Sequence, residues 1–364
     1  TITADLELTS DNLYILDGIV TVGVDVGADG NATDGDPAIL TIQPGTTIYG
    51  GQGDSVLVVA RGSQLIADGT QANPIIFTSA QDLGFDDELR DNAGTTDIGL
   101  AARTQTANTP FDEPFTGEWG GLVIAGRAPI NTCDFDTNGP CESEAEATQE
   151  IYGGSDVADS SGILRYVRVQ YAGFRFNGEQ ELNGIGFFGV GNGTTVDFVQ
   201  VHNNLDDGVE FFGGTVDAKH LFLSGNGDDN MDWTQGWTGR VQHVAIVQTP
   251  NVTFSEDPRG FEGDSNSNNP LFTPVAGPVV SNFTIVGRTD TAADIREGML
   301  IRRGSGGLFY NGVVTGWPRA CLDLDGSETF AQAGATVNTI GTELTVQSTL
   351  LACDDPTEDE AEDP

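Results

Sequence analysis

The chain has 364 residues, of which 49 are glycine and 15 are proline, and its formal net charge is −40. Polyphosphates and anionic lipids are bound by clustered cations, so we expect neither a nucleic-acid partner nor membrane insertion. The glycine content and the short runs of β-branched residues exclude a mainly helical protein. The acidity has two explanations, which are solubility, including adaptation to high salt, or binding of divalent cations or basic partners.

Short apolar runs between Gly, Asn and Asp clusters predict many short strands joined by tight turns. The first third of the chain predicts a strand–turn–strand unit at 38–50 and strands at 56–60, 64–67, 74–78 and 117–124. Longer loops are expected at 80–116, 131–160 and 250–277. Long insertions on a repetitive scaffold often carry function.

The middle of the chain repeats itself. LNGIGFF at 182–188 aligns with DDGVEFF at 206–212 and DDNMDWT at 228–234, at offsets of 24 and 22 residues, and a weaker copy lies at 259–263. A second strand repeats in phase at 164–169, 196–201, 218–223, 241–246 and 281–286. Its third position holds a ring each time, which predicts a column of Tyr166, Phe198, His220, His243 and Phe283, extended by Tyr310.

Two strands that repeat together about every 22 residues, without helices between them, predict an all-β right-handed parallel β-helix. Equivalent residues of neighbouring coils then stack about 4.8 Å apart. Alternation along a strand places Val209 and Phe211 inside the helix and Glu210 outside. The predicted interior stacks are Ile185, Val209, Met231 and Phe261, and Phe187, Phe211 and Trp233. We expect one β-helix domain over 1–353 and an acidic tail over 354–364.

The four cysteines fall into two local pairs, Cys133 with Cys141 and Cys321 with Cys353. Four cysteines allow three connectivities, and we favour the two local ones because each pair brackets a polar stretch. Disulfides form in oxidising compartments, so we expect an extracellular or cell-surface protein. The first residues carry no signal segment, so the chain is expected to be the mature form after export.

Three segments carry a family resemblance. They are LTIQPGT at 40–46, WGGLVIAGRAPIN at 119–131 and YVRVQYAG at 166–173. With them the chain resembles, over roughly 35–320, a set of exported bacterial proteins, often lipoproteins or surface proteins, with a right-handed parallel β-helix of the pectate-lyase-like type. The resemblance implies this fold and export. It implies no activity, because the fold serves lyases, hydrolases, adhesins and stalks.

Three carboxylates take the same outward position in successive coils, namely Glu210, Asp232 and Glu262, here called the carboxylate ladder. Stacking places like charges about 5 Å apart, where each repels the next by about 1 kcal/mol at the surface. Bound cations, neighbouring arginines or protonation must therefore compensate. Ca²⁺ accepts six to eight oxygen ligands in flexible geometry. The predicted ligands are Asp206, Asp207, Glu210, Asp228, Asp229, Asp232, Glu262 and Asp264; the turn aspartates have the alternative role of capping backbone groups.

Two functional classes remain. The first is a non-catalytic surface protein that binds Ca²⁺ and presents its faces or ends to an extracellular glycan, a surface protein or another copy of itself. The second is a polysaccharide lyase or glycoside hydrolase acting on an acidic polysaccharide. Its candidate catalytic residues are Glu210, Asp232, Glu262, Arg259, Arg302 and Arg303. Trp237 and Trp317 have two alternative roles, which are stacking on sugars if they are exposed or packing in the core or in a loop. We favour the first class, because no complete set of base and carboxylates can be assembled from the sequence.

Overall fold

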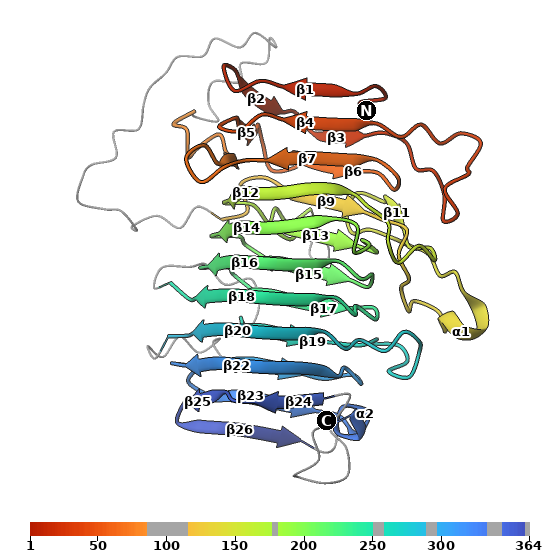
Figure 1. Cartoon of the computed structure of the whole chain (residues 1–364). Helices are drawn as coiled ribbons and strands as arrows, with labels where there is room; N and C mark the ends of the chain where they lie inside the picture. The colour runs from red at the N-terminus through yellow and green to blue at the C-terminus, as the bar shows by residue number, and fades with distance from the viewer. Residues whose placement is uncertain (86–115, 177–180, 250–257, 289–296, 333–343, 361–364) are drawn as a thin grey trace.

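The computed structural model describes residues 1–85, 116–176, 181–249, 258–288, 297–332 and 344–360. These residues form a parallel β-helix, in which successive coils stack from the N-terminal to the C-terminal end (Figure 1). The all-β prediction and the predicted stacking of coils are confirmed. Within the described ranges, neither helix has the length or apolar character needed to cross a membrane.

One sheet, here called the ladder sheet, runs along one side of the β-helix. Its strands pair in parallel with the strand one coil before and one coil after. The strands are β3 (Ile19–Val22), β6 (Val56–Val59), β9 (Gly121–Ala125), β13 (Ile185–Phe188), β15 (Val209–Phe212), β17 (Met231–Thr234), β19 (Phe261–Gly263), β21 (Met299–Ile301), β23 (Ala320–Asp325) and β26 (Asp355–Glu360).

A second long sheet, here called the bent sheet, covers the other sides of the core. Its strands also pair in parallel from coil to coil. The strands are β1 (Leu6–Leu8), β2 (Leu13–Leu16), β4 (Ile39–Ile42), β5 (Thr47–Gly50), β7 (Gln64–Asp68), β8 (Ile75–Ser79), β12 (Gly162–Gln170), β14 (Thr195–His202), β16 (Asp217–Ser224), β18 (Arg240–Val247), β20 (Val279–Val286), β22 (Gly307–Thr315), β24 (Leu344–Gln347) and β25 (Leu350–Ala352).

Each long strand of the bent sheet turns a corner at one residue. Tyr166, Phe198, His220 and His243 have φ values of 49°, 54°, 51° and 64°. Strand β12 pairs with β7 before Tyr166 and with β8 after it, so the pairing skips the corner residue. A left-handed residue redirects an extended chain. The bent sheet therefore supplies two sides of the β-helix and the ladder sheet supplies the third.

Four of the predicted rings stack along this corner. The ring centroids of Tyr166 and Phe198 lie 4.5 Å apart, those of Phe198 and His220 4.1 Å, and those of His220 and His243 4.9 Å. The rings are within 7° of parallel. This part of the predicted ring column is confirmed.

The predicted place of Phe283 in the ring column and the predicted extension to Tyr310 are wrong. The corner positions of the next two coils are Asn282 and Asn311, both with φ of 58°, and Asn311 Nδ2 donates to Asn282 Oδ1 over 2.6 Å. Asparagine tolerates left-handed φ better than a bulky ring does. A shift of one residue along a strand moves a side chain to the other face, so Phe283 packs in the core instead.

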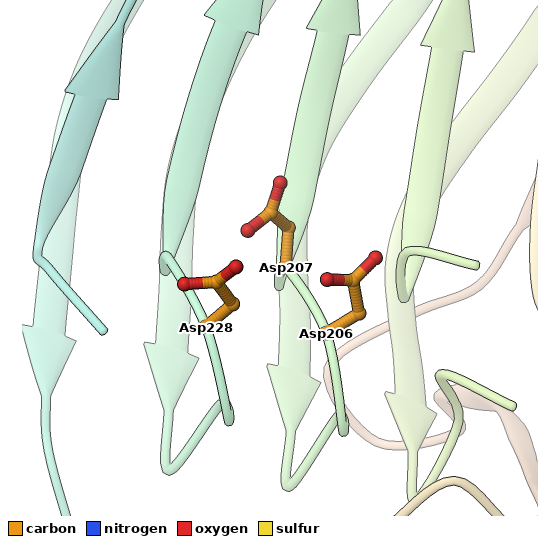
Figure 2. A group of neighbouring side chains, drawn as sticks. All are labelled: Asp206, Asp207 and Asp228. Atoms are coloured by element: carbon orange, nitrogen blue, oxygen red, sulfur yellow. The ribbon is translucent and has the colours of Figure 1, made fainter. Parts of the chain in front are cut away.

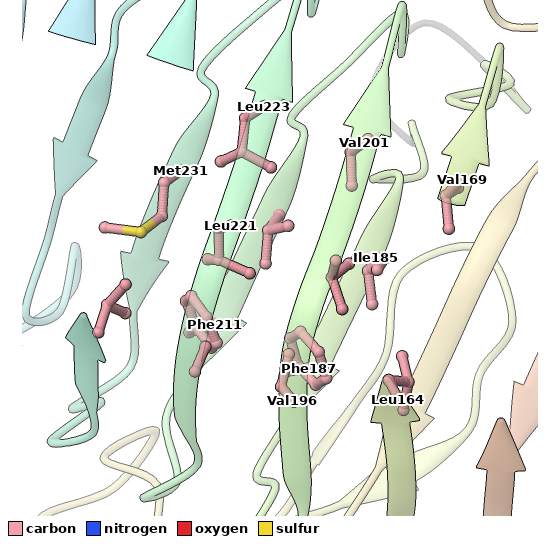
Figure 3. Close-up of a cluster of buried hydrophobic side chains, with 14 of the residues drawn as sticks. Leu164, Val169, Ile185, Phe187, Val196, Val201, Phe211, Leu221, Leu223 and Met231 are labelled. Atoms are coloured by element: carbon pink, nitrogen blue, oxygen red, sulfur yellow. The ribbon is translucent and has the colours of Figure 1, made fainter. Parts of the chain in front are cut away.

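The interior is filled by the predicted stacks. Ile185 pairs with Val209, which pairs with Met231, which pairs with Phe261. All four side chains are at most 1% exposed, and Figure 3 shows Ile185 and Met231 of this stack among the apolar side chains between the two sheets. Trp237 and Trp317 are also buried, at 0% and 1% exposed, so the core-packing alternative holds for both rings and sugar stacking does not.

The loop at 131–160 folds back over the outer face of the ladder sheet. It contains α1 (Phe135–Asn138) and a small antiparallel pair, β10 (Ser143–Glu144) with β11 (Ile151–Tyr152). Tyr152 packs against Phe188 with ring centroids 5.1 Å apart, within a second apolar cluster. The predicted loops at 80–116 and 250–277 lie partly outside the described residues.

The C-terminal boundary differs from the prediction. Residues 355–360 form β26, which pairs in parallel with β23, so the β-helix continues past residue 353. Pairing satisfies backbone groups that a free tail would leave to water, and composition alone does not reveal it. Helix α2 (Ser327–Gln332) lies between β23 and β24. The last predicted tail residues, 361–364, lie outside the described ranges.

Both predicted disulfides are present. Cys133 bonds to Cys141, and Cys321 bonds to Cys353. The second bond ties β23 to the residue that follows β25, so it fastens the final coil to the body of the β-helix.

Candidate metal centre

The carboxylate ladder has the predicted register. Glu210 of β15 pairs with Asp232 of β17, and Asp232 pairs with Glu262 of β19. All three point away from the apolar interior, because their neighbours along the strand occupy it. Glu210 is nevertheless only 9% exposed and Glu262 only 6%. Two of the three ladder acids are therefore buried, where uncompensated charge is costly, and Asp232 between them is partly exposed.

A second column, here called the entry column, lies beside the ladder. Its members stand two residues before the first inward residue of each ladder-sheet strand, and they are Asn183, Asp207, Asp229, Arg259 and Glu297. Asn183 Nδ2 donates to Glu210 Oε2 over 2.7 Å. Our reading of the sequence missed Asn183 and Glu297. The constant two-residue offset was the signal that could have found them.

The turn aspartates have a structural role as well as a place in the acidic cluster. Asp207 Oδ1 accepts a hydrogen bond from the Asp229 backbone N–H over 2.9 Å, and Asp229 Oδ1 accepts one from the Arg259 N–H over 2.7 Å. This capping is the predicted alternative. Figure 2 shows Asp206 and Asp207 on one turn and Asp228 on the turn of the next coil, and one carboxylate oxygen of each lies within 4.8 Å of the others.

Arginines neutralise the C-terminal half of the ladder. Arg259 Nη1 lies 2.7 Å from Glu262 Oε2, and Arg302 also contacts Glu262. Asp264 receives Arg302 Nε at 2.9 Å and Arg303 Nη1 at 2.5 Å. The three arginines that were candidate catalytic bases are thus held in ion pairs with predicted metal ligands. Three of the eight predicted ligands have guanidinium partners, because Arg259 Nη1 also lies 3.9 Å from Asp229 Oδ2.

The N-terminal half has no such compensation. Asp207, Glu210 and Asp232, here called the acidic triad, each offer an oxygen, and these atoms lie within 4.8 Å of one another. In the described part of the chain, no Lys or Arg forms an ion pair with any of the three. Asp232 Oδ1 and Asn183 Oδ1 are buried without a hydrogen-bond partner there. Calcium–oxygen distances of about 2.3–2.6 Å allow one ion to bridge oxygens up to about 5 Å apart.

The sequence model of the pectate-lyase-like beta helix domain matches residues 1–89 and 104–360. The chain belongs to this family. No curated protein and no solved structure matches it. Membership accounts for the coiled architecture and does not identify a reaction, because one fold serves many sites.

In this pectate-lyase-like β-helix, burial is the main cause of the raised pKa values of the acidic triad. It raises the pKa of Asp207 and of Glu210 well above the usual range, and repulsion from Asp206 and Asp232 respectively adds to the increase. Burial and the charge of Glu262 raise the pKa of Asp232 in the same way. A raised pKa favours the protonated form of each acid unless a cation binds close to it. The charge of the triad can therefore be neutralised by protons or by a divalent cation.

Stability in chelator is expected to fall as pH rises. Unfolded carboxyls ionise near pH 4, whereas burial and repulsion from Asp25 raise the pKa of Glu150 to about 7, and the triad pKa values are raised too. The folded protein then binds protons more tightly, so this stabilisation is complete below pH 4 and lost as pH rises through the folded pKa values. The melting temperature in EDTA should be lower at pH 8 than at pH 5. An increase over that interval would contradict the raised pKa values.

Proposed function

We propose that this pectate-lyase-like β-helix is an exported, non-catalytic binding protein whose acidic triad holds Ca²⁺. One observation carries the proposal: Asp207, Glu210 and Asp232 bring three carboxylates together, the first two of them buried, without an ion pair to Lys or Arg among the described residues. The contrast with Glu262 strengthens it, because the same ladder one coil further on does have arginine partners. All of the triad ligands are carboxylate oxygens, which suit a hard cation such as Ca²⁺.

The arginine contacts favour a binding role over catalysis. A general base must be free to reach the proton that it abstracts. Arg259 is 6% exposed and donates to Glu262 and Glu297, while Arg302 is committed to Glu262 and Asp264. The lyase or hydrolase alternative therefore has less support. The two disulfides agree with the proposed export, because such bonds persist in oxidising compartments.

The proposal predicts a calcium-dependent gain in stability. A ligand that binds only the folded chain adds about 2.7 kcal/mol at a free concentration one hundred times Kd. Melting curves of the full chain in EDTA and in excess CaCl₂ at pH 8 measure the gain, and calorimetric titration gives the stoichiometry. Mg²⁺ is the control, because it requires near-ideal octahedral geometry and should give a smaller gain. Identical melting in EDTA and CaCl₂ would overturn the calcium assignment.

The non-catalytic part of the proposal needs its own assay. The full chain is incubated with acidic polysaccharides in CaCl₂, and release of unsaturated sugars or reducing ends is followed. We expect neither product above the buffer blank. Release that disappears in Asp232→Asn would replace the binding role with the enzyme alternative.

The first coil offers a surface for self-association, and we expect a second copy to bind there. Leu6, Leu13, Ile15 and Ile19 are 43–50% exposed on β1, β2 and β3. In the described structure β1 and β2 pair on one edge only, with β4 and β5, whereas β3 pairs with β6 and also bridges Ile2 at Val22 (Figure 1). An open edge with apolar side chains favours pairing with another chain. Sedimentation should show a dimer whose dissociation constant falls as the NaCl concentration is raised, because salt screens the repulsion between the acidic surfaces.

The variant Leu13→Asp tests this contact. It should shift the protein to monomer, whereas Leu350→Asp, at an exposed leucine near the other end, should not. A wild-type monomer at every salt concentration would rule out association through the first coil.

A further inference from the structure

A second cluster of carboxylates lies near the C-terminal end of the ladder sheet. Glu297 belongs to the entry column before β21, Asp323 lies on β23 and Glu358 lies on β26. Asp323 pairs directly with Glu358 across the two strands. One oxygen from each residue lies within 4.8 Å of the others. Three acids from separate segments therefore lie together where β26, the last strand of the ladder sheet, pairs with β23 of the β-helix.

Arg319 compensates this cluster in part. Its Nη1 lies 3.0 Å from Glu297 Oε1, and its Nε lies 2.8 Å from Glu358 Oε2. Arg259 Nε also lies 3.1 Å from Glu297 Oε2, but Arg259 forms a second ion pair with Glu262. If Arg319 is counted here and Arg259 with the ladder, three carboxylates and one guanidinium leave a charge of −2. One divalent cation neutralises that charge.

Asp323 is the member of the cluster that points to a ligand. It is 6% exposed, and its Oδ1 is buried without a hydrogen-bond partner in the described structure. It forms no ion pair there, although Glu297 and Glu358 both contact Arg319. Burial and the charge of Glu297 raise its pKa to about 7. A buried carboxylate oxygen beside two further carboxylates, with no donor of its own, is suited to coordinating a cation.

We propose that Glu297, Asp323 and Glu358 form a second Ca²⁺ site, distinct from the acidic triad, that fastens β26 onto β23. The ion bridges the entry column, the penultimate ladder strand and the last one. Calcium thereby closes the C-terminal end of the β-helix, which would otherwise present the edge of β23 to solvent. This site shares no ligand with the acidic triad, so it does not depend on the function proposed for that triad.

Hydrogen exchange of the β26 amides in the full chain tests the proposal. Local opening of β26 breaks the site, so CaCl₂ at one hundred times Kd should slow its exchange about 100-fold relative to EDTA. Asp323→Asn should lose this calcium effect, and its exchange in EDTA should be slower than that of the wild type because repulsion is removed. Asp355→Asn, at an exposed aspartate of the same strand, is the matched control and should keep the full effect.

Two results would overturn the second site. One is calcium protection of β26 that is equal in Asp323→Asn and the wild type, and the other is no protection in the wild type. Asp232→Asn separates the two sites, because it should lose calcium binding at the triad and keep protection of β26. Exchange in β13 and β15 reports whether each variant is folded.

Discussion

Replacing Arg259 by methionine is expected to destabilise the protein by about 3–5 kcal/mol, the usual cost of removing one partner from a buried ion pair. Arg259 is 6% exposed, and its guanidinium lies 2.7 Å from Glu262 and 3.1 Å from Glu297. Methionine fills a similar volume but leaves two buried carboxylates without this partner. The loss should appear in chemical unfolding at pH 8.

Arg240→Met is the matched control for this experiment. Arg240 forms an ion pair with Asp217, but its side chain is 70% exposed. Exposed pairs contribute about 0.2–1 kcal/mol, so this variant should stay close to the wild type. The double variant Arg259→Met with Glu297→Gln should recover part of the lost stability, because it also removes a buried carboxylate that has lost one of its two arginine partners. Equal small losses for Arg259→Met and Arg240→Met would show that the buried arginine does not neutralise the ladder.

Asp232→Asn is expected to change stability in opposite directions in the two buffers. In EDTA the variant should be more stable than the wild type, because a like charge beside Glu210 and Glu262 is removed. In CaCl₂ it should be less stable, because the wild type gains about 2.7 kcal/mol at one hundred times Kd and the variant loses a ligand. A reversal of the order of stability between EDTA and CaCl₂ would indicate that Asp232 is a cation ligand. Turn capping alone predicts no such reversal.

Asp264→Asn provides the comparison for Asp232→Asn. Asp264 belongs to the same acidic region but receives Arg302 and Arg303. Its neutralisation should lower stability in both buffers and leave the calcium gain intact. If Asp232→Asn also lowered stability in both buffers, Asp232 would be a structural acid like Asp264, and the triad would lose its assignment as a calcium site.

The sequence predicted the carboxylate ladder because two simple periods determine it. Side chains alternate along a strand, and each coil returns to the same point after one repeat. The offsets from Ile185 to Val209 and then to Met231 therefore fixed the register of Glu210 over Asp232. The same rule applied one residue out of step gave the error at Phe283, since the corner residue of each long strand has to be identified before the count is right.

Only the tertiary structure determined which acids are neutralised by an arginine. Glu262 and Asp232 hold equivalent positions in the sequence repeat, yet Glu262 receives Arg302 from 40 positions further along the chain, and Asp232 receives no arginine in the described residues. These ion-pair partners depend on loop lengths and side-chain rotamers, and neither of these follows the sequence repeat. For the same reason the meeting of Glu297, Asp323 and Glu358 was not predicted, because it requires the acidic C-terminal segment to pair as β26. A repeat specifies stacking within a column, whereas compensation between columns depends on where non-repeating segments fold.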